Sequence, residues 1–461
     1  MATTPLYKNS QDVIPNRTDA PTSGGYYIFI ITYLVLLSAF GSFVNDMYIP
    51  TLPSMVKFFH CSVSTVQLGL TFGMIGLGVG EMILGPFSDR WGRKPILIAA
   101  LVVFAIGAFC SVWSKSIEEF IWWRLVQGLG ASGGYFLART IPADMYHGQD
   151  LAKVMALVGA INGFAPASAP VIGGFVSRAV GWKGIFWILF GFSLLLLVLS
   201  FIFKESLPKE RRVQGHFGIA FKNYIYLLKN KQFVVHILLK GSALGMLFAY
   251  ISAAPFIIQT HYGYNQLQFG LFMGFNALFV ACGAMVALKF KPLRNGAVFA
   301  GRTLFLISIG QFICLYLVDN VWVYEAWNVA LIFCMGMLFT VANTLAMNEG
   351  RDYAGDASAL VGLVGYIFGA IASPLVGLGD ILHSTAITLF VLAFITLVFT
   401  RMTKVLPPDL EPTTQSMHAT GLPKYPTPLS TPKSASPANS TSAAITMPAS
   451  SDSNQKSTPL P

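Results

Sequence analysis

Two carboxyl side chains lie deep inside long apolar stretches of the sequence. The chain has 20 acidic residues. Asp46 and Glu81 stand well within apolar stretches, and the others can be placed in loops, tails or the ends of stretches. A carboxyl inside a membrane-spanning helix costs on the order of 2.5–3.5 kcal/mol on insertion scales, so it is by default a functional group that faces a cavity. Asp46 is therefore predicted to exchange protons; the alternative is a structural carboxylate held by helix-breaking backbone near Pro50.

Arg124 lies in a later apolar stretch at a depth that matches Asp46. Each stands about six residues inside the outer end of its stretch, so at about 1.5 Å per residue the two depths agree. A nearby arginine favours the ionised carboxylate, whereas desolvation favours the neutral acid. The sequence thus predicts a proton-coupling pair that responds to water entry, with a permanent buried ion pair as the alternative.

Two further charged residues lie nearer the ends of their stretches. Glu81 comes shortly before Gly85, where water can reach it, and is a further candidate for proton coupling. Lys240 lies about one to two turns into the seventh stretch, and its aliphatic stem is expected to carry the ammonium group to the cytoplasmic surface.

The elements that must position these groups follow from the composition. Of 461 residues, 54% are hydrophobic and 11% are charged, whereas an ordinary soluble domain carries roughly 25% charged residues. Apolar stretches of about 18 to 25 residues recur from Tyr26 to Phe399, each long enough to cross a bilayer. Twelve stretches fit best. The predicted fold class is therefore an all-α integral membrane protein with twelve transmembrane helices.

The net charge of +10 does not indicate nucleic acid binding, because the basic residues follow a membrane topology. About 24 of the 30 Lys and Arg fall in the N-terminal tail, the even-numbered loops and the C-terminal tail. This asymmetry places both termini in the cytoplasm. The remaining six lie on the opposite side (Lys57, Lys115, Arg178 and Lys183) or inside stretches (Arg124 and Lys240).

The five cysteines show neither a disulfide framework nor metal-ligand spacing. No metal, cofactor or catalytic residue is predicted, and the chain is not expected to be an enzyme.

A charged segment divides the chain into halves that show weak internal similarity. Residues 26–203 and 233–402 are predicted to form one six-helix bundle each, joined by a cytoplasmic loop at 204–232. Residues 1–25 and the Pro/Ser/Thr-rich 403–461 are predicted to be disordered cytoplasmic tails. Tandem repeats of this kind build many secondary transporters, although chance matches of Pro and Gly are the alternative. The matches at offsets of 204 or 205 are Pro170 with Pro374, Arg90 with Arg294, Gly92 with Gly296 and Pro50 with Pro255.

The loop after the second stretch reads GPFSDRWGRKP, from Gly85 to Pro95. By composition alone it is a basic cytoplasmic turn made tight by glycine. It resembles the signature between the second and third helices of the major facilitator superfamily. The resemblance implies a charge relay that latches the cytoplasmic gate against the start of the eleventh helix, near Asp356. The matching residues are Gly85, Asp89, Arg90, Gly92, Arg93 and Lys94.

Other segments resemble drug:proton antiporters of this superfamily, of the Bcr/CflA group and its MdfA-like relatives. The fourth stretch contains RLVQGLGASGG from Arg124, which resembles the motif whose arginine is implicated in proton transfer. NDMYIPTLP (Asn45 to Pro53) and SAAPF (Ser252 to Phe256) resemble the Bcr/CflA group. The fifth stretch, APASAPVIGGF, resembles the antiporter motif through Pro166, Pro170, Gly173 and Gly174, with Ala165 and Ala169 where glycine is common.

The resemblance covers residues 26–402 and is weaker in the second half, where KFKPLRNG lacks an acidic residue. It implies two six-helix bundles around a central cavity and proton-driven export of small, drug-like molecules from a bacterial inner membrane by a monomer. It also implies that Asp46 couples proton and substrate. A second carboxylate, present in the first helix of some multidrug members, is missing, since Ser38 and its neighbours are neutral. Candidate cavity residues are Asn45, Tyr48, Gln127, Tyr250, Asn276 and Tyr366.

Two other functions fit the same features. The fold could export a sugar, an amino acid or another metabolite, since fold does not dictate substrate. A sensor that signals through the long tail is the second alternative. Against the sensor, a protein that only signals needs no intramembrane Asp and Arg at matched depth.

Overall fold

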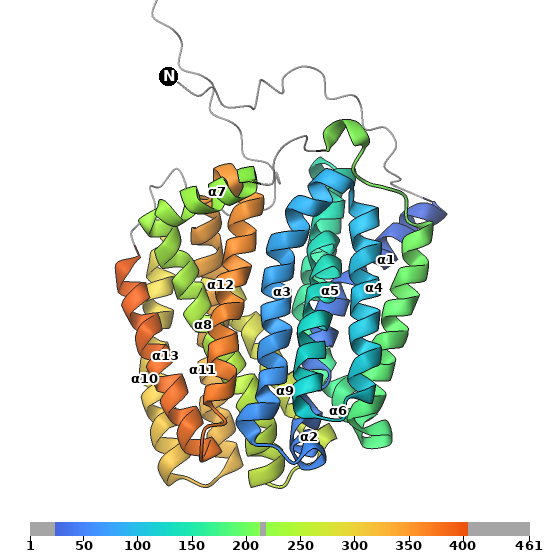
Figure 1. Cartoon of the computed structure of the whole chain (residues 1–461). Helices are drawn as coiled ribbons and strands as arrows, with labels where there is room; N and C mark the ends of the chain where they lie inside the picture. Colours follow the sequence, from blue (N-terminus) through green and yellow to red (C-terminus); the bar gives the residue numbers. More distant parts are fainter. Residues whose placement is uncertain (1–23, 213–217, 404–461) are drawn as a thin grey trace, which may run out of the picture. The chain divides into compact units, whose positions relative to one another are not determined.

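The computed structural model describes residues 24–212 and 218–403, and every regular element in these ranges is a helix (Figure 1). The predicted tails at 1–25 and 403–461 lie outside the described residues except at their inner ends. The first half is defined as the described chain up to residue 212, and the second half as the described chain from residue 218.

The first half contains six α-helices and two short 3-10 turns, η1 and η2. Gly181, with φ +65°, interrupts the helical backbone of α6 and divides it into two segments. The elements are α1 (Gly25–Asp46), η1 (Ile49–Thr51), α2 (Leu52–Phe59), α3 (Val63–Trp91), α4 (Arg93–Trp113), α5 (Ile117–Met145), α6 (Gly148–Ile202) and η2 (Lys209–Arg211).

The second half begins with a short helix and continues with longer ones. A π-helical turn, η3, follows directly on Pro255 at the end of α8. The elements are α7 (Gly218–Lys229), α8 (Lys231–Pro255), η3 (Phe256–His261), α9 (Gln266–Ala287), α10 (Leu293–Leu317), α11 (Val321–Glu349), the 3-10 turn η4 (Arg351–Tyr353), α12 (Ala354–Leu375) and α13 (Ile381–Met402).

Within the described residues, ten helical stretches are long and apolar enough to cross a membrane. Helix α5 is not among them, because Arg124, Gln127 and its many glycines lower its hydropathy. Helix α6 counts as one stretch although it has 55 residues and the break at Gly181.

The helices of each half pack mainly on one another. In the first half α5 packs on α1, α3 and α4, and α6 packs on α1 and α4. In the second half α11 packs on α8, α9 and α10, and α13 packs on α8 and α10. The halves meet where α3 runs along α12 and where α6 runs along α9; Figure 1 shows α3 and α12 side by side.

Helix α7 lies in the segment that the sequence indicated as a loop. Its Tyr224 and Leu227 are buried against Phe233 of α8 and Ala357 of α12. An apolar pair three residues apart therefore turns part of a charged linker into a packed helix. We refer to the end of the molecule that carries α7 as the α7 end and to the opposite end, which carries α2, as the α2 end (Figure 1).

Glycines set the distance between α3 and α5. A Cβ atom on Gly76 would lie 2.9 Å from the Cα of Gly128 and would also meet the carbonyl oxygen of Leu125. These are main-chain atoms, so they cannot move aside as a flexible side chain would. The two helices pack with their backbones in contact, as helices in lipid do where small residues face each other.

We expect Gly76→Ala to destabilise the protein by about 1–3 kcal/mol, because the added methyl group forces α3 and α5 apart. The matched control is Gly191→Ala in α6, where a Cβ meets nothing within 4 Å and the helix gains propensity. Thermal unfolding of the two variants in detergent checks this. Equal melting temperatures would contradict the close backbone packing.

Candidate functional site

A cavity of about 760 Å³ lies between the two halves. Most of its wall is apolar, with side chains from α1, α3, α5, α6, α8, α9, α11 and α12. Four ionisable groups of opposite signs also face it: Asp46, Glu81, Arg139 and Lys240. The predicted site residues in its lining are Asn45, Asp46, Glu81, Pro166, Pro170, Tyr250, Asn276 and Tyr366.

Asp46 is the last residue of α1 and lies in the cavity wall. The helix stops there, and the 3-10 turn η1 follows with Pro50 in its first turn. In the part of the chain that the structure describes, the Asp46 carboxylate makes no hydrogen bond or ion pair with another side chain. It is thus an acidic group that faces the cavity, with its oxygens available to water, substrate or a proton.

Arg124 is fully buried next to this position, but neutral groups hold it. Its guanidinium donates to Asn45 Oδ1 at 3.2 Å, to Gln127 Oε1 at 2.7 Å and to the carbonyl of Gly69 at 3.3 Å. It also lies 4.5 Å from the centre of the Tyr48 ring. Among the described residues Arg124 and Asp46 are not in ion-pair contact, but Arg124 is near enough to attract the Asp46 carboxylate electrostatically.

The same network accounts for two candidates that do not line the cavity. Gln127 is fully buried and donates to the carbonyl of Gly107 at 3.1 Å and to Ser111 Oγ at 2.6 Å. Tyr48 is fully buried beneath the guanidinium. The structure therefore places Tyr48 and Gln127 behind the cavity wall, as supports of Arg124.

Glu81 forms an ion pair with Arg139, at 3.1 Å between Oε1 and Nη2. The guanidinium of Arg139 stacks 4.3 Å above the centre of the Tyr135 ring on its own helix. Sequence reasoning missed Arg139, because this residue was counted with the loops. Helix α5 continues to Met145, so Arg139 lies within it and faces the cavity.

Lys240 also lines the cavity. The sequence instead predicted that its side chain extends to the cytoplasmic surface. Its Nζ donates to Asn343 Oδ1 on α11 at 2.8 Å. The side chain therefore crosses from α8 toward α11 instead of running along its own helix to the end.

Glu325 is a second residue that sequence reasoning missed. It was placed at the end of a stretch, but in α11 its side chain is 5% exposed and its carboxylate lies beside the amides of Asn276 and Asn328. Buried amides surround it: Asn276 donates to Tyr250 at 2.6 Å, and Gln311 lies 3.4 Å from Asn328. The offset of 204 that relates the halves brings Arg124 onto Asn328, three residues after Glu325, and so pointed to this part of α11 but not to Glu325 itself.

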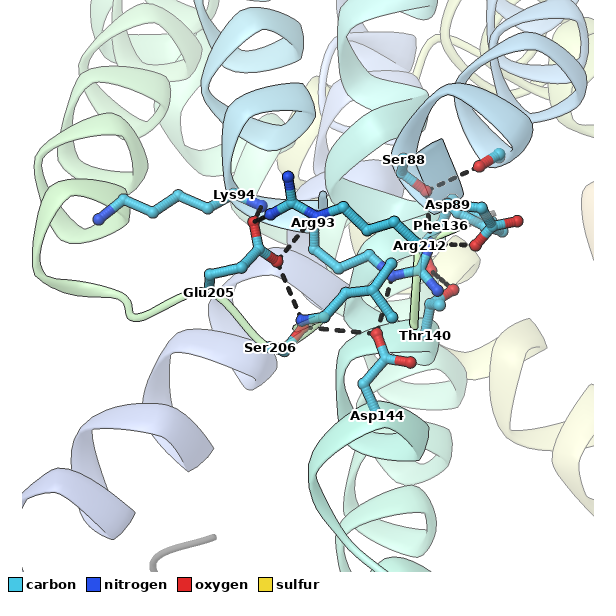
Figure 2. Close-up of polar contacts among 12 residues, drawn as sticks. Ser88, Asp89, Arg93, Lys94, Phe136, Thr140, Asp144, Glu205, Ser206 and Arg212 are labelled. Atoms are coloured by element: carbon cyan, nitrogen blue, oxygen red, sulfur yellow. Dashed lines mark hydrogen bonds and ion pairs between the residues drawn. The ribbon is translucent and has the colours of Figure 1, made fainter. Parts of the chain in front are cut away.

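The loop between α3 and α4 forms a polar cluster around Arg93 (Figure 2). Gly92 makes the turn with φ +102°. The Arg93 guanidinium donates to Asp144 Oδ2 at 2.7 Å and to Ser88 Oγ at 2.6 Å, and it pairs with Asp89. Arg93 is only 5% exposed, so this cluster ties together the ends of α3, α4 and α5.

Glu205 closes the other side of this cluster (Figure 2). Its carboxylate accepts from the backbone N–H groups of Arg93 at 2.9 Å and Lys94 at 3.2 Å, and it pairs with Arg212 at 3.5 Å. A carboxylate at the first turn of α4 satisfies free N–H groups and complements the helix dipole.

The start of α12 is bound by α7. Asp356 accepts a hydrogen bond from Asn223 at 2.8 Å. Burial and the nearby carboxylates of Asp356 and Asp89 raise the pKa of Tyr224 on α7 to about 12. Asp89 of the loop, Tyr224 of α7 and Asp356 of α12 thus lie near one another.

The glycines of the APASAPVIGGF segment bring α6 against other backbones. A Cβ on Gly173 would meet the carbonyl oxygen of Met47, and one on Gly174 would meet that of Gln266. Gly173 therefore lets α6 approach the turn that follows Asp46, and Gly174 lets it approach the start of α9.

Hydrogen bonds between the halves close the cavity toward the α2 end. The donors on α3 are in its first turns, next to α2, and a further donor is on η3. Each acceptor is a main-chain carbonyl of the opposite half. The bonds run from Ser64 to Pro374 (2.9 Å), from Gln67 to Ser252 (3.0 Å), from Thr71 to Ala370 (2.9 Å) and from Gln259 to Pro50 (3.0 Å).

Several known proteins resemble this chain. It is 33% identical over 379 residues to an uncharacterized MFS-type transporter, YdgK, of Bacillus subtilis, covering 79% of this chain and 92% of that protein. It is 29% identical to a bicyclomycin resistance protein homolog of Haemophilus influenzae (76% and 89% covered) and 27% identical to multidrug resistance protein D of Escherichia coli (72% and 84% covered).

Solved structures share the fold at low identity. A bacterial homolog of the human lysosomal transporter Spinster, inward-facing and occupied, matches with a TM-score of 0.67 at 15% identity, over 85% of this chain and 100% of that one. The inward, partially occluded xylose transporter XylE of E. coli matches with a TM-score of 0.63 at 15% identity, over 82% and 98%.

The family model described as Major Facilitator Superfamily matches residues 34–374, most of the part that the structure describes. This confirms the resemblance that the sequence motifs indicated. The chain belongs to the Major Facilitator Superfamily and is an integral membrane transporter.

Proposed function

We propose that this protein exports small, drug-like molecules in exchange for protons, with Asp46 as the proton-binding group. The observation that carries the proposal is the Asp46 carboxylate in the cavity wall, which within the described residues makes no ion pair or side-chain hydrogen bond and lies one residue from Asn45, which holds the buried Arg124. A drug-like substrate is supported by relatives named for resistance to bicyclomycin, to chloramphenicol and to multiple drugs.

We further propose twelve transmembrane helices in two six-helix bundles. The ten apolar stretches become twelve when α5 is included and α6 is divided at Gly181. The basic residues then place the α7 end and both termini in the cytoplasm. The bacterial relatives support an inner-membrane location, and a monomer contains the whole cavity.

In alternating access, the cavity would be closed at one end while it is open at the other, and the two ends would then switch. The α2 end is closed by the hydrogen bonds between α3 and the second half. At the α7 end, the Arg93 cluster would hold α3, α4 and α5 as one unit while that end opens and closes. Proton binding to Asp46 would remove a charge from the wall and so change the cost of exposing it to either side.

Asp46→Asn should abolish uphill transport while retaining substrate binding, because the amide has the same size but does not titrate. Losing one coupled proton forfeits about 2.3 kcal/mol per 100 mV, or roughly a 50-fold loss of concentrating power. The measurement is substrate-induced proton release and uphill flux in everted vesicles, with a panel of drugs as substrates.

The matched control is Asp150→Asn, which removes an exposed carboxylate that pairs with Lys153 outside the cavity. It should transport at the wild-type level. A correctly inserted Asp46→Asn protein that still concentrates drug would move the assignment to Glu81. Drug binding without flux in the wild-type protein would favour the sensor.

Arg93→Ala should reduce turnover by roughly tenfold without changing which compounds are carried, because the cluster loses its charged donor but lies away from the cavity. Asp89→Asn should have a smaller effect, since the Asp89 side chain is 44% exposed and Arg93 keeps Asp144. Initial rates and drug profiles in vesicles test both, with exposed Arg178→Ala as the control. An altered drug profile at an unchanged rate would contradict the latch.

A further inference from the structure

Lys240 is a cation in the cavity wall without a carboxylate bonded to it. Its Nζ donates to the neutral Asn343 amide, and within the described residues it takes part in no ion pair. A charged side chain at membrane depth is costly unless it faces water or a partner of opposite charge. Lys240 thus has one hydrogen bond to the protein and two further N–H donors for a ligand.

Arg139 brings a second cation to the same part of the cavity. It lies near Lys240, and Glu81 lies near both. Glu81 is bonded to Arg139 at 3.1 Å, so one carboxylate faces two cations. This group of three, contributed by α3, α5 and α8, therefore carries a net positive charge.

The cavity extends from these cations along an apolar wall. Lys240 and Tyr250 both line it and are ten residues apart on α8, which is about 15 Å along the helix axis. Leu244, Phe248 and Phe339 are among the apolar lining residues. The space suits a molecule with an apolar body and a charged group at one end, which is the usual character of a small-molecule site.

We propose that Lys240, assisted by Arg139, is an anion subsite that binds a carboxylate or a similar anionic group of the substrate. The substrate class is then amphipathic acids and zwitterions. In a zwitterion the cationic group would face Asp46, beyond the Glu81–Arg139 pair. The proposal rests on the export function proposed above and specifies its substrates.

The test compares each acid with its own methyl ester, so that only the anionic group changes. Norfloxacin, dansylglycine and naphthaleneacetic acid, with their esters, are titrated into the purified full-length protein in lipid nanodiscs without any gradient. The variants are Lys240→Met, Lys240→Arg and Lys57→Met. Lys57 is an exposed lysine of α2 and serves as the matched control.

We expect at least one of the acids to bind wild-type protein about tenfold or more tightly than its ester, the effect of a hydrogen bond to a charged group. Lys240→Met should bring the acid down to the affinity of its ester and leave ester binding unchanged. Lys240→Arg and Lys57→Met should keep the preference.

Equal binding of acid and ester by the wild-type protein, or no acid binding across the panel, would overturn the proposal, and neither result needs a variant that folds. Persistence of the preference in Lys240→Met would also overturn it and leave Lys240 as a structural partner of Asn343. Proton-driven export of the esters without acid preference would preserve the export function while refuting the subsite. Preferential binding of the acid without proton-driven export would support the anion subsite while refuting the export function.

Discussion

Main-chain carbonyls at membrane depth need hydrogen-bond donors, and this requirement determines how the halves meet. Pro374 has no N–H, so the carbonyl of Ala370, one turn earlier, loses its intrahelical donor. Thr71 of the other half donates to that carbonyl. At the end of α8, the N–H of Phe256 turns to Ala253 instead of Ser252, and Gln67 donates to the carbonyl left free. Helix irregularities in one half are thus completed by side chains of the other.

A similar requirement governs the buried charges. Arg124 has neutral amide and carbonyl acceptors, which satisfy its N–H groups while leaving Asp46 without a fixed partner. A direct ion pair would favour the ionised carboxylate and, under the proton coupling proposed above, would have to be broken at every proton transfer. Glu81, in contrast, is paired with Arg139.

Apolar length and motif spacing were enough to predict the helical membrane fold and the family. They also identified Asp46 and Glu81 as candidates, because a carboxyl inside an apolar stretch can be recognised from the sequence alone. The sequence did not show the direction in which each side chain points. Gln127 and Tyr48 carry the right polarity for a cavity, but they pack behind its wall, since the helical face that meets a neighbour depends on packing between distant segments.

Other differences have the same origin. Arg139 and Glu325 lie near the ends of apolar stretches, where sequence cannot separate a loop from a helix that continues. Lys240 turns toward α11 because Asn343 offers an acceptor there, a contact over 103 positions of sequence. Helix α7 escaped notice because the charged residues just before it, from Lys204 to Arg212, made the whole segment look like a polar linker.

The hydrogen bonds that join the halves have a genetic consequence. Every acceptor among those described is a backbone oxygen, which all twenty amino acids carry, so substitutions at Ala370 or Ser252 leave the acceptor atom in place. Only the donor positions, such as Gln67 and Thr71, can lose the bond through a change of side chain. Natural variation that adjusts how readily this end of the transporter opens should therefore concentrate on one partner of each contact, and compensating pairs of substitutions should be rare there.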